Sequence, residues 1–386
     1  MDTPILHFSR DEFAQRQKAA RAKMAEQGLH GLVMFRQESM YYLTGYDTMG
    51  YTMFQALYLG ADGQLTLLTR TADRIQSRAT SIIDDIRIWY DSAGANPALD
   101  LRAILEEHGC RGKRVGIEYH AYGLTAQRGK MVDAALDGFC TTVDASDLVR
   151  LLRLVKSPAE LDYTRKAGGL CDLIYKVSVE NVKPGISTKA IFGKMLEAQM
   201  AAGGDPAASR WPFGGGEAKF FGRYHTGENI VGNEDNVIFE PGAAYRLYHA
   251  ATVYNVIVGK VDPRLIDMNK ACGDAVAACQ DNLRPGRTVG DVFAAHQKTF
   301  DKAGFGHATQ AACGYTMGAM YPPTWMDWPM IYKDNPQVIE AGMVFFTHMM
   351  LFDRPAGLSM CIGETVIVTK GAPERINHIP REVIRV

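Results

Sequence analysis

Helix-like and strand-like hydrophobic patterns alternate along residues 1–153. Apolar residues recur at helical spacing in some segments, and short apolar runs bounded by turn residues occur in others. The predicted helices are residues 8–28, 99–108 and 127–136, and the predicted strands are residues 31–35, 56–59, 65–68 and 114–118. Residues 40–46 fit either a helix or a loop. This alternation predicts an α/β N-terminal domain of the doubly wound type.

A helix-start signal separates this region from the rest of the chain. Ser157 precedes Pro158 and is followed three residues later by Glu160, which is the pattern of a capping box with proline in the first turn. We therefore expect a long helix to begin at Pro158. The predicted domains are residues 1–153 and residues 154–386.

Two segments of the second domain repeat one pattern. Residues 183–192 and 284–293 each contain a basic residue, Pro-Gly, a hydroxyl residue two positions after the glycine, and a final Ile-Phe or Val-Phe pair. Each segment follows a predicted helix, residues 158–181 or residues 263–283, and would cap the next helix. The repeat predicts an α+β domain with an internal pseudo-twofold duplication and a site between its halves.

Residues 240–259 concentrate acid, imidazole and phenol side chains on one predicted hairpin. Pro241-Gly242 is a strong turn signal, and residues 245–258 are rich in Tyr, Val, Thr and Ile. Because side chains alternate along a strand, Tyr248 and Tyr254 would share one face while His249 lies on the other. These groups serve a single site only if a bulge interrupts the strand. Otherwise they belong to a half-buried strand.

Composition excludes several classes of partner. Lys+Arg is 42 and Asp+Glu is 43, which gives a net charge of −1 and no global electrostatic surface for nucleic acid or an anionic membrane. Hydrophobic residues make up 47% of the chain, enough to bury a substantial core. We expect the partners to be small molecules and a second copy of the chain.

The cysteines and the N-terminal residues indicate the cellular compartment that we expect for this protein. The seven cysteines are scattered without a C-x-x-C pair, which is typical of free thiols in a reducing compartment. Residues 1–10 lack the pattern of a leader, and the chain has no run of about 18 apolar residues. We therefore expect a soluble, cytoplasmic protein.

Several short motifs resemble those of the creatinase, prolidase and aminopeptidase P family. They are Y-L-T-G at residues 42–45, V-K-S-P-A-E-L at 155–161, the two Pro-Gly segments, E-A-G-M-V-F at 340–345 and G-E-T-V-I-V-T at 363–369. The resemblance extends over nearly the whole chain. It implies a creatinase-type α/β N-terminal domain, a pita-bread catalytic domain and a homodimer in which the N-terminal domain of one copy reaches the active site of the other.

The metal-binding positions of that family are altered in this chain. In the peptidases, two Asp, one His and two Glu hold two metal ions that activate a bridging water. The corresponding positions here are Glu240, Ala251, Tyr315, His348 and Gly363. Alanine and glycine have no side-chain donor, so the resemblance implies that the two-metal centre is lost and that no metal cofactor is needed. A single ion held by His249, His348 and a Glu is a remaining alternative.

The ectoine hydrolase and creatinase branch, which is metal-independent, resembles this chain more closely. His225, in F-G-R-Y-H-T, lies upstream of the first ligand position, as the histidine of creatinase does. Residues 245–249, Y-R-L-Y-H, and residues 314–325, with G-Y-T-M-G and P-P-T-W, are similar to ectoine hydrolase motifs. Residues 253–255 are V-Y-N where that branch tends to have S-R-T, so a cationic group is lost.

This resemblance implies a hydrolase that cleaves a carbon–nitrogen bond of a small cationic or zwitterionic compound, such as a cyclic amidine, a guanidino compound or an amide. His225 is the candidate general acid and base, because an imidazole can accept and return a proton near neutral pH. Glu240 and Glu364 would bind the cation through charge-assisted hydrogen bonds. The other substrate-binding candidates are Tyr248, His249, Tyr254, Tyr315, His348, Phe213, Trp325 and Tyr51, the last in the loop 46–51 expected to reach a second copy's site.

Three alternatives stay open. A lyase on the same scaffold would remove a carbon-bound proton from an onium zwitterion, which aromatic residues and an acid would also suit. An Xaa-Pro peptidase would need the metal ligands that this chain lacks. A non-catalytic pita-bread binding protein would be expected to carry charged tails, and the sequence has no such run.

Overall fold

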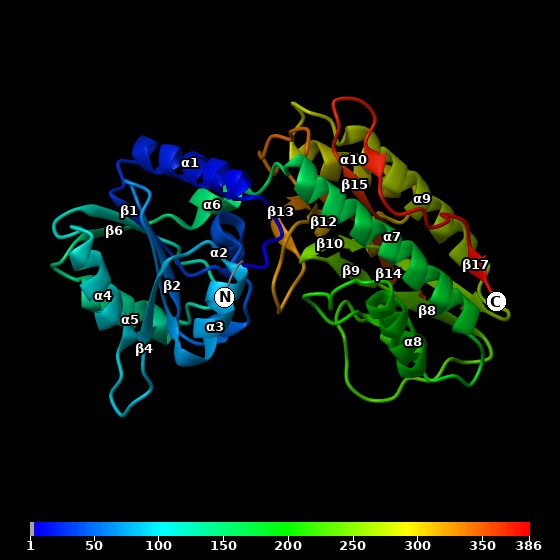
Figure 1. Cartoon of the computed structure of the whole chain (residues 1–386). Coiled ribbons are helices and arrows are strands. Elements are labelled where there is room, and N and C mark those ends of the chain that lie inside the picture. Colours follow the sequence, from blue (N-terminus) through cyan, green and yellow to red (C-terminus); the bar gives the residue numbers. More distant parts are fainter. Residues whose placement is uncertain (1–3) are drawn as a thin grey trace. The chain divides into compact units, whose positions relative to one another are not determined.

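The computed structural model describes residues 4–386, and the chain divides into two compact units, Met1–Arg153 and Leu154–Val386 (Figure 1). Each unit has two hydrophobic core clusters of its own. Within the described residues, none of the helices combines the length and the apolar character needed to cross a membrane.

A six-stranded mixed sheet in the order β4-β3-β2-β1-β5-β6 forms the centre of the first unit. The strands are β1 (Gly31–Met34), β2 (Ala56–Gly60), β3 (Leu65–Arg70), β4 (Asp85–Trp89), β5 (Arg114–Ile117) and β6 (Thr141–Asp144). The helices are α1 (Arg10–Glu26), α2 (Gln37–Thr44), α3 (Arg74–Thr80), α4 (Pro97–Glu107), α5 (Ala126–Leu136) and α6 (Ser146–Leu152). β2 is antiparallel to both of its neighbours, β1 and β3, and the other neighbouring strands of this sheet are parallel to one another.

Helices cover both faces of this sheet. Leu101 of α4 and Val132 of α5 belong to one buried cluster, and Met24 of α1 and Val149 of α6 belong to the other. The α/β class expected for this domain is confirmed. The sequence patterns did not reveal α3, α6, β4 and β6, which are short.

Two helix pairs and three small sheets make up the second unit. The helices are α7 (Pro158–Asn181), α8 (Thr188–Ala201), α9 (Arg264–Asn282) and α10 (Val289–Ala303). The sheets have the orders β17-β11-β8-β7, β10-β9 and β13-β12-β14-β15-β16. The strands are β7 (Phe213–Gly214), β8 (Asp235–Phe239), β9 (Gly242–Tyr245), β10 (Tyr248–Ala251), β11 (Tyr254–Val258), β12 (Ala312–Thr316), β13 (Asp327–Tyr332), β14 (Val344–Asp353), β15 (Leu358–Ile367), β16 (Glu374–Arg375) and β17 (Ile384–Arg385).

The second unit is built from two similar halves, as expected for a pita-bread domain. α7 and α8 pack with β8–β11 around one core cluster, and α9 and α10 pack with β12–β15 around the other. At the start of the second helix of each pair, Ser187 bridges to Ile230 and Thr288 bridges to Val338 in the same antiparallel manner. The predicted duplication is confirmed, because both Pro-Gly segments lie between the paired helices.

Candidate functional site

The predicted hairpin is longer and more broken than its sequence suggests. β8 pairs with β11 and β9 pairs with β10, so one antiparallel hairpin extends from Asp235 to Val258 with an interruption in each arm. The turn lies at Arg246 and Leu247, whose φ angles of 48° and 70° are left-handed. The turn predicted at Pro241-Gly242 was wrong, because the proline interrupts the pairing there without reversing the chain.

Tyr248 and Tyr254 both face α7. The Tyr248 hydroxyl donates to Glu160 Oε1 at 2.7 Å, and the Tyr254 hydroxyl lies 2.6 Å from Ser178 Oγ. Glu160 and Ser178 both belong to α7, and both tyrosines are buried. These two phenols connect the hairpin to the helix, and the substrate-binding role expected for them stays a prediction.

His249 lies on the opposite side of β10 from Tyr248, and both nitrogens of its ring have backbone partners. The backbone N–H of Ala208 donates to Nε2 at 2.9 Å, and Nδ1 lies 3.4 Å from the carbonyl oxygen of Gly318. Burial lowers the pKa of His249 to about 4, so the ring is neutral. Both ring nitrogens therefore have backbone partners in this structure, and the expected role of His249 as a substrate or metal ligand stays a prediction.

Three of the altered metal-ligand positions carry the side chains of a common floor. The rings of Tyr315 and His348 lie 5.4 Å apart, centroid to centroid, and Trp325 Nε1 donates to the Tyr315 hydroxyl at 2.8 Å. The pKa of Tyr315 is raised well above its usual value, first by burial and then by the charge of Glu240. We call Glu240, Tyr315, Trp325 and His348 the site floor.

Two glycines allow close packing in and around the site floor. A Cβ on Gly242 would lie 2.9 Å from the Trp325 ring, so the indole rests directly on β9. A Cβ on Gly363 would lie 2.6 Å from Val253 Cγ1 and 2.9 Å from the Phe346 ring. Contacts that short are below ordinary van der Waals separation. A larger side chain at position 363 would therefore require the floor to move.

The Glu240 carboxyl is buried without a protein partner. Glu240 is 7% exposed, and its backbone N–H donates to the Pro212 carbonyl at 2.9 Å. Within residues 4–386, its side chain makes neither a hydrogen bond nor an ion pair. Burial raises the pKa of Glu240 to about 7, although the positive charge of Arg223 opposes that rise. A buried carboxylate without a partner is costly, so this group is poised for a cation or a proton.

His348 is also held in its neutral form. Burial lowers its pKa to about 4, with smaller contributions from His296 and Arg223. Its Nδ1 atom is enclosed and has no hydrogen-bond partner in the part of the chain that the structure describes. The ring packs against Phe346 at 5.2 Å as well as against Tyr315. His348 therefore offers the site a neutral imidazole rather than a cation.

A loop that contains Arg223 and His225 packs against Phe213 near the end of β8. Tyr224, between them, packs its ring 6.0 Å from that of Phe213, which pairs with Phe239, the neighbour of Glu240. His225 is half-buried with its ring 5.1 Å from that of Phe221. Arg223 was missed by the sequence analysis, although it lies in the same F-G-R-Y-H-T segment, because only the fold shows that its charge acts on the floor.

Glu364 lies in a network of hydrogen bonds and ion pairs with Gln280, Arg375 and Arg381. Its carboxylate accepts hydrogen bonds from Gln280 Nε2 at 2.8 Å, from Arg375 at 2.7 Å, and from Arg381 at 2.7 and 2.8 Å. Because side chains alternate along β15, Glu364 points away from the face that Gly363 occupies. Two arginines already neutralise Glu364, and its expected role in binding a cationic substrate stays a prediction.

Of the expected aromatic walls, Trp325 belongs to the floor and Phe213 does not. The Phe213 ring stacks on Phe192 of α8 at 5.3 Å and supports Tyr224 on another edge. Phe213 therefore positions the loop with Arg223 rather than lining the floor. Tyr51 lies in the first unit, in the 3-10 turn Gly50–Thr52, where its ring is buried. Its expected role in a second copy's site stays a prediction.

The floor does not fit a two-metal centre. Ala251 and Gly363 supply no donor, and the Tyr315 hydroxyl already accepts from Trp325. Across residues 4–386, no group of three or more His, Cys, Asp or Glu side chains is arranged to hold a metal ion. Two oxygen-rich metal sites require several carboxylates, and Glu240 is the one carboxylate of the floor.

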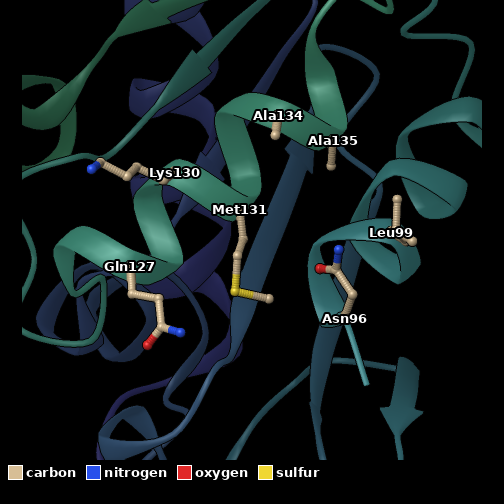
Figure 2. Close-up of a pocket in the computed structure, with 7 residues that line it drawn as sticks. All are labelled: Asn96, Leu99, Gln127, Lys130, Met131, Ala134 and Ala135. Carbon is tan, nitrogen blue, oxygen red and sulfur yellow. The ribbon is translucent and has the colours of Figure 1, made fainter. Parts of the chain in front are cut away.

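A separate hollow lies in the first unit, between α4 and α5 (Figure 2). It has a volume of about 370 Å³, and Figure 2 shows Asn96, the residue before α4, and Leu99 of α4 facing Met131 of α5 across it. Among its lining residues only Lys130 is ionisable, so the hollow lacks the paired acid and base groups that hydrolysis needs.

Two family models match the chain. Residues 162–370 match metallopeptidase family M24, and residues 16–155 match the creatinase/prolidase N-terminal domain. The chain belongs to metallopeptidase family M24, which confirms the resemblance drawn from its motifs. It is thus a member of a family of hydrolases.

The chain is similar to several known proteins over nearly its whole length and theirs. The ectoine hydrolase of Halomonas elongata is 26% identical over 397 residues, with 98% of each chain covered. An uncharacterized hydrolase/peptidase of Sinorhizobium fredii is 29% identical over 393 residues, covering 98% of this chain and 99% of its own. The solved structure of dipeptidase PepE from Mycobacterium ulcerans has a TM-score of 0.86 at 24% identity, with 98% of this chain and 99% of that chain covered. A prolidase from Thermococcus sibiricus has a TM-score of 0.87 at 19% identity, with coverages of 98% and 100%. These structures show the shared fold.

Proposed function

We propose that this protein is a hydrolase that opens a carbon–nitrogen bond in a small cationic or zwitterionic substrate without a metal ion. A cyclic amidine or a guanidino compound fits best. The observation that carries the proposal is the buried carboxyl of Glu240, which has no partner among the described residues and whose charge helps to raise the pKa of Tyr315. The similarity to an ectoine hydrolase over 98% of both chains supports the same reaction class.

The cation would bind at Glu240. An amidinium or guanidinium presents planar N–H donors that match a carboxylate, and their positive charge would stabilise the ionised form of the acid. In the free protein the pKa of Glu240 is about 7, so the group is partly protonated near neutral pH. Binding of a cation would release that proton and satisfy a buried group that otherwise lacks a partner.

Hydrolysis would then need a base and a proton donor. His225 is the proposed base: it would take a proton from water while the water oxygen bonds to the amidine carbon. The imidazolium would next return that proton to the leaving nitrogen as the carbon–nitrogen bond breaks. Tyr315 would stabilise the tetrahedral intermediate through its hydroxyl, which Trp325 Nε1 holds at 2.8 Å. His348 would orient the substrate as a neutral hydrogen-bonding group.

The metal-free character of this proposal rests on the donor set. A dipeptidase of the same fold would need carboxylates at positions 251 and 363, where this chain has Ala251 and Gly363. We therefore assign the polarisation of the scissile bond to Glu240 and Tyr315.

Screening for binding and then for turnover tests the proposed function. Ectoine, creatine and small amidines would be added to the purified protein, because a ligand that binds the native state raises its melting temperature. We expect at least one such compound to bind and to be hydrolysed, and we expect Glu240→Gln and His225→Ala to abolish turnover. Full turnover in His225→Ala would refute the role of that residue.

A lyase is the second candidate, favoured by the pairing of Glu240 with the aromatic groups of Tyr315 and Trp325. A sulfonium or ammonium group would bind an acid flanked by aromatic faces just as an amidinium does. Product analysis in water labelled with heavy oxygen separates the two reactions. A hydrolase incorporates the label into its product, whereas a lyase yields an unlabelled alkene.

A further inference from the structure

We propose that Asp235 is a positioning residue for the reaction, because its carboxylate holds together the two ends of the loop that carries His225 and ties that loop to the strand that leads to Glu240. This inference rests on the proposed function, in which His225 is the base and Glu240 binds the cation. We call residues 215–232 the His225 loop.

The Asp235 carboxylate accepts backbone N–H groups from both ends of the His225 loop. Oδ1 accepts from Gly216 at 3.0 Å and from Asn236 at 2.8 Å, and Oδ2 accepts from Gly232 at 3.0 Å. Asp235 is 9% exposed, so these bonds are largely shielded from water. Hydrogen bonds to an ionised carboxylate are about twice as strong as those between neutral groups. One side chain therefore closes the loop at its base.

A second side chain reinforces the same closure. Asn229 Oδ1 accepts from the N–H of Gly215 at 3.0 Å, and Asn229 Nδ2 donates to the Gly215 carbonyl at 3.2 Å. The backbone carbonyl of Asn229 in turn accepts from the N–H of Thr188, the first residue of α8, at 2.8 Å. The last part of the His225 loop is thus bound both to the first part and to a helix.

Glycine at positions 215 and 216 allows the two ends to approach each other. A Cβ on Gly215 would overlap Oδ2 of Asp235, so any other residue there would displace the carboxylate. Gly216 has a φ of 56°, in the left-handed region that glycine adopts without strain. These two glycines therefore serve a fixed closure of the loop.

The strand β8 connects this closure to Glu240. Asp235 is the first residue of β8, and Glu240 follows its last residue. The segment that leads into the His225 loop also lies along β8, because Phe213 pairs with Phe239. The acid and the base of the loop therefore share one rigid element. Loss of the Asp235 bonds would let the loop move with respect to Glu240.

The middle of the His225 loop also contacts the turn between β14 and β15. Glu217 pairs with Arg354 at 3.3 Å, and both side chains are exposed. The Phe220 ring meets that of Phe352 edge-on at a centroid distance of 6.2 Å. Exposed ion pairs stabilise by about 1 kcal/mol or less. We therefore assign the placement of His225 mainly to the buried bonds at the ends of the loop.

Two measurements on the full-length protein test this inference. The first is the rate of trypsin cleavage after Arg223, an exposed residue of the His225 loop. The second is kcat and KM with ectoine, creatine or any screened amidine that the wild type hydrolyses. The variants are Asp235→Ala and Asp235→Asn. Asp291→Asn is the matched control, because the Asp291 carboxylate also accepts a backbone N–H, that of Thr288 at 2.8 Å, but caps α10.

We expect the loop to open and the chemical step to slow in Asp235→Ala. Cleavage after Arg223 should be at least about tenfold faster than in the wild type, because opening no longer breaks bonds to a charged acceptor. kcat should fall by about ten- to a hundredfold with KM nearly unchanged, because a displaced base slows the reaction more than binding. Asp235→Asn should be intermediate, since it keeps the oxygen that binds Gly216 and Asn236. Asp291→Asn should change neither rate.

Three outcomes would overturn the inference, and they separate it from the proposed function. If both Asp235 variants are cleaved no faster than Asp291→Asn, the loop does not depend on Asp235. If cleavage is faster but kcat is unchanged while His225→Ala is inactive, the proposed function stands and Asp235 has no positioning role. If the wild type hydrolyses none of the compounds, or His225→Ala keeps full kcat, the proposed function fails and this inference fails with it. Asp235→Asn decides each case if the alanine variant does not fold.

Discussion

Val253 and Gly363 exchange two backbone hydrogen bonds, with N···O distances of 3.2 and 2.9 Å. This bridge joins the interrupted hairpin to β15 and presses Gly363 against the Val253 side chain. We expect Gly363→Ala to lower the free energy of unfolding by about 1–3 kcal/mol, because its Cβ would overlap Val253 and Phe346. Denaturant unfolding measures this change.

Gly193→Ala is the matched control for that experiment. Gly193 lies in the interior of α8, and a Cβ there would meet no atom within 4 Å. Alanine is the better helix former, so the free energy of unfolding should rise by about 0.5–1 kcal/mol. If Gly363→Ala lowers the free energy of unfolding by no more than the size of the change in Gly193→Ala, the tight contact of Gly363 with Val253 and Phe346 is contradicted.

Glu364→Gln separates stability from catalysis. The substitution leaves Arg375 and Arg381 without their counter-charge, so the free energy of unfolding should fall by about 2 kcal/mol. Turnover by the folded fraction should change little, because Glu364 faces away from the floor. If Glu364→Gln loses turnover while its free energy of unfolding is unchanged, Glu364 takes part in the reaction.

Removing single tyrosine hydroxyls distinguishes the floor from the helix-facing side of the hairpin. Tyr248→Phe and Tyr254→Phe should each cost about 1 kcal/mol of stability through the lost bonds to Glu160 and Ser178, with kcat retained. Tyr315→Phe should lower kcat by about a hundredfold, as expected when a donor to the intermediate is lost. Steady-state kinetics of the three variants would show whether only Tyr315 matters for the reaction.

The pH dependence of stability reports on Glu240. Its pKa is raised from 4.5 to about 7 in the folded state, so the native protein binds more protons than the unfolded chain between those values. The free energy of unfolding should therefore fall as the pH rises through this window, by about 3 kcal/mol from this group alone. Subtracting the profile of Glu240→Gln removes the contributions of other groups. A flat difference between pH 4.5 and pH 7 would contradict the buried, unpartnered acid.

Local signals predicted most of the second unit's helices. Ser157, Pro158 and Glu160 form the expected capping box, and the helix begins at Pro158 as predicted. The two Pro-Gly segments were informative because caps and breakers act within a few residues of sequence. The family and the pita-bread fold followed from such motifs.

The composition of the site depended on tertiary relationships that the sequence did not reveal. Glu364 follows the last ligand position by one residue, and in a strand one residue is the difference between the two faces. Tyr248 and Tyr254 have the residue type expected of a proton donor, yet their side of the hairpin is covered by α7. Arg223 is distant from Glu240 in sequence, so its effect on the acid emerges only from the fold.

The central claim is that this member of metallopeptidase family M24 acts without a metal ion. The most direct measurement is the rate of hydrolysis of a substrate found in the screen, taken before and after dialysis against a chelator, with bound transition metals quantified by mass spectrometry in the same samples. We expect an unchanged rate in protein that holds far less than one metal ion per chain. A rate that falls with the metal content and returns when manganese, cobalt or zinc is added would contradict the account.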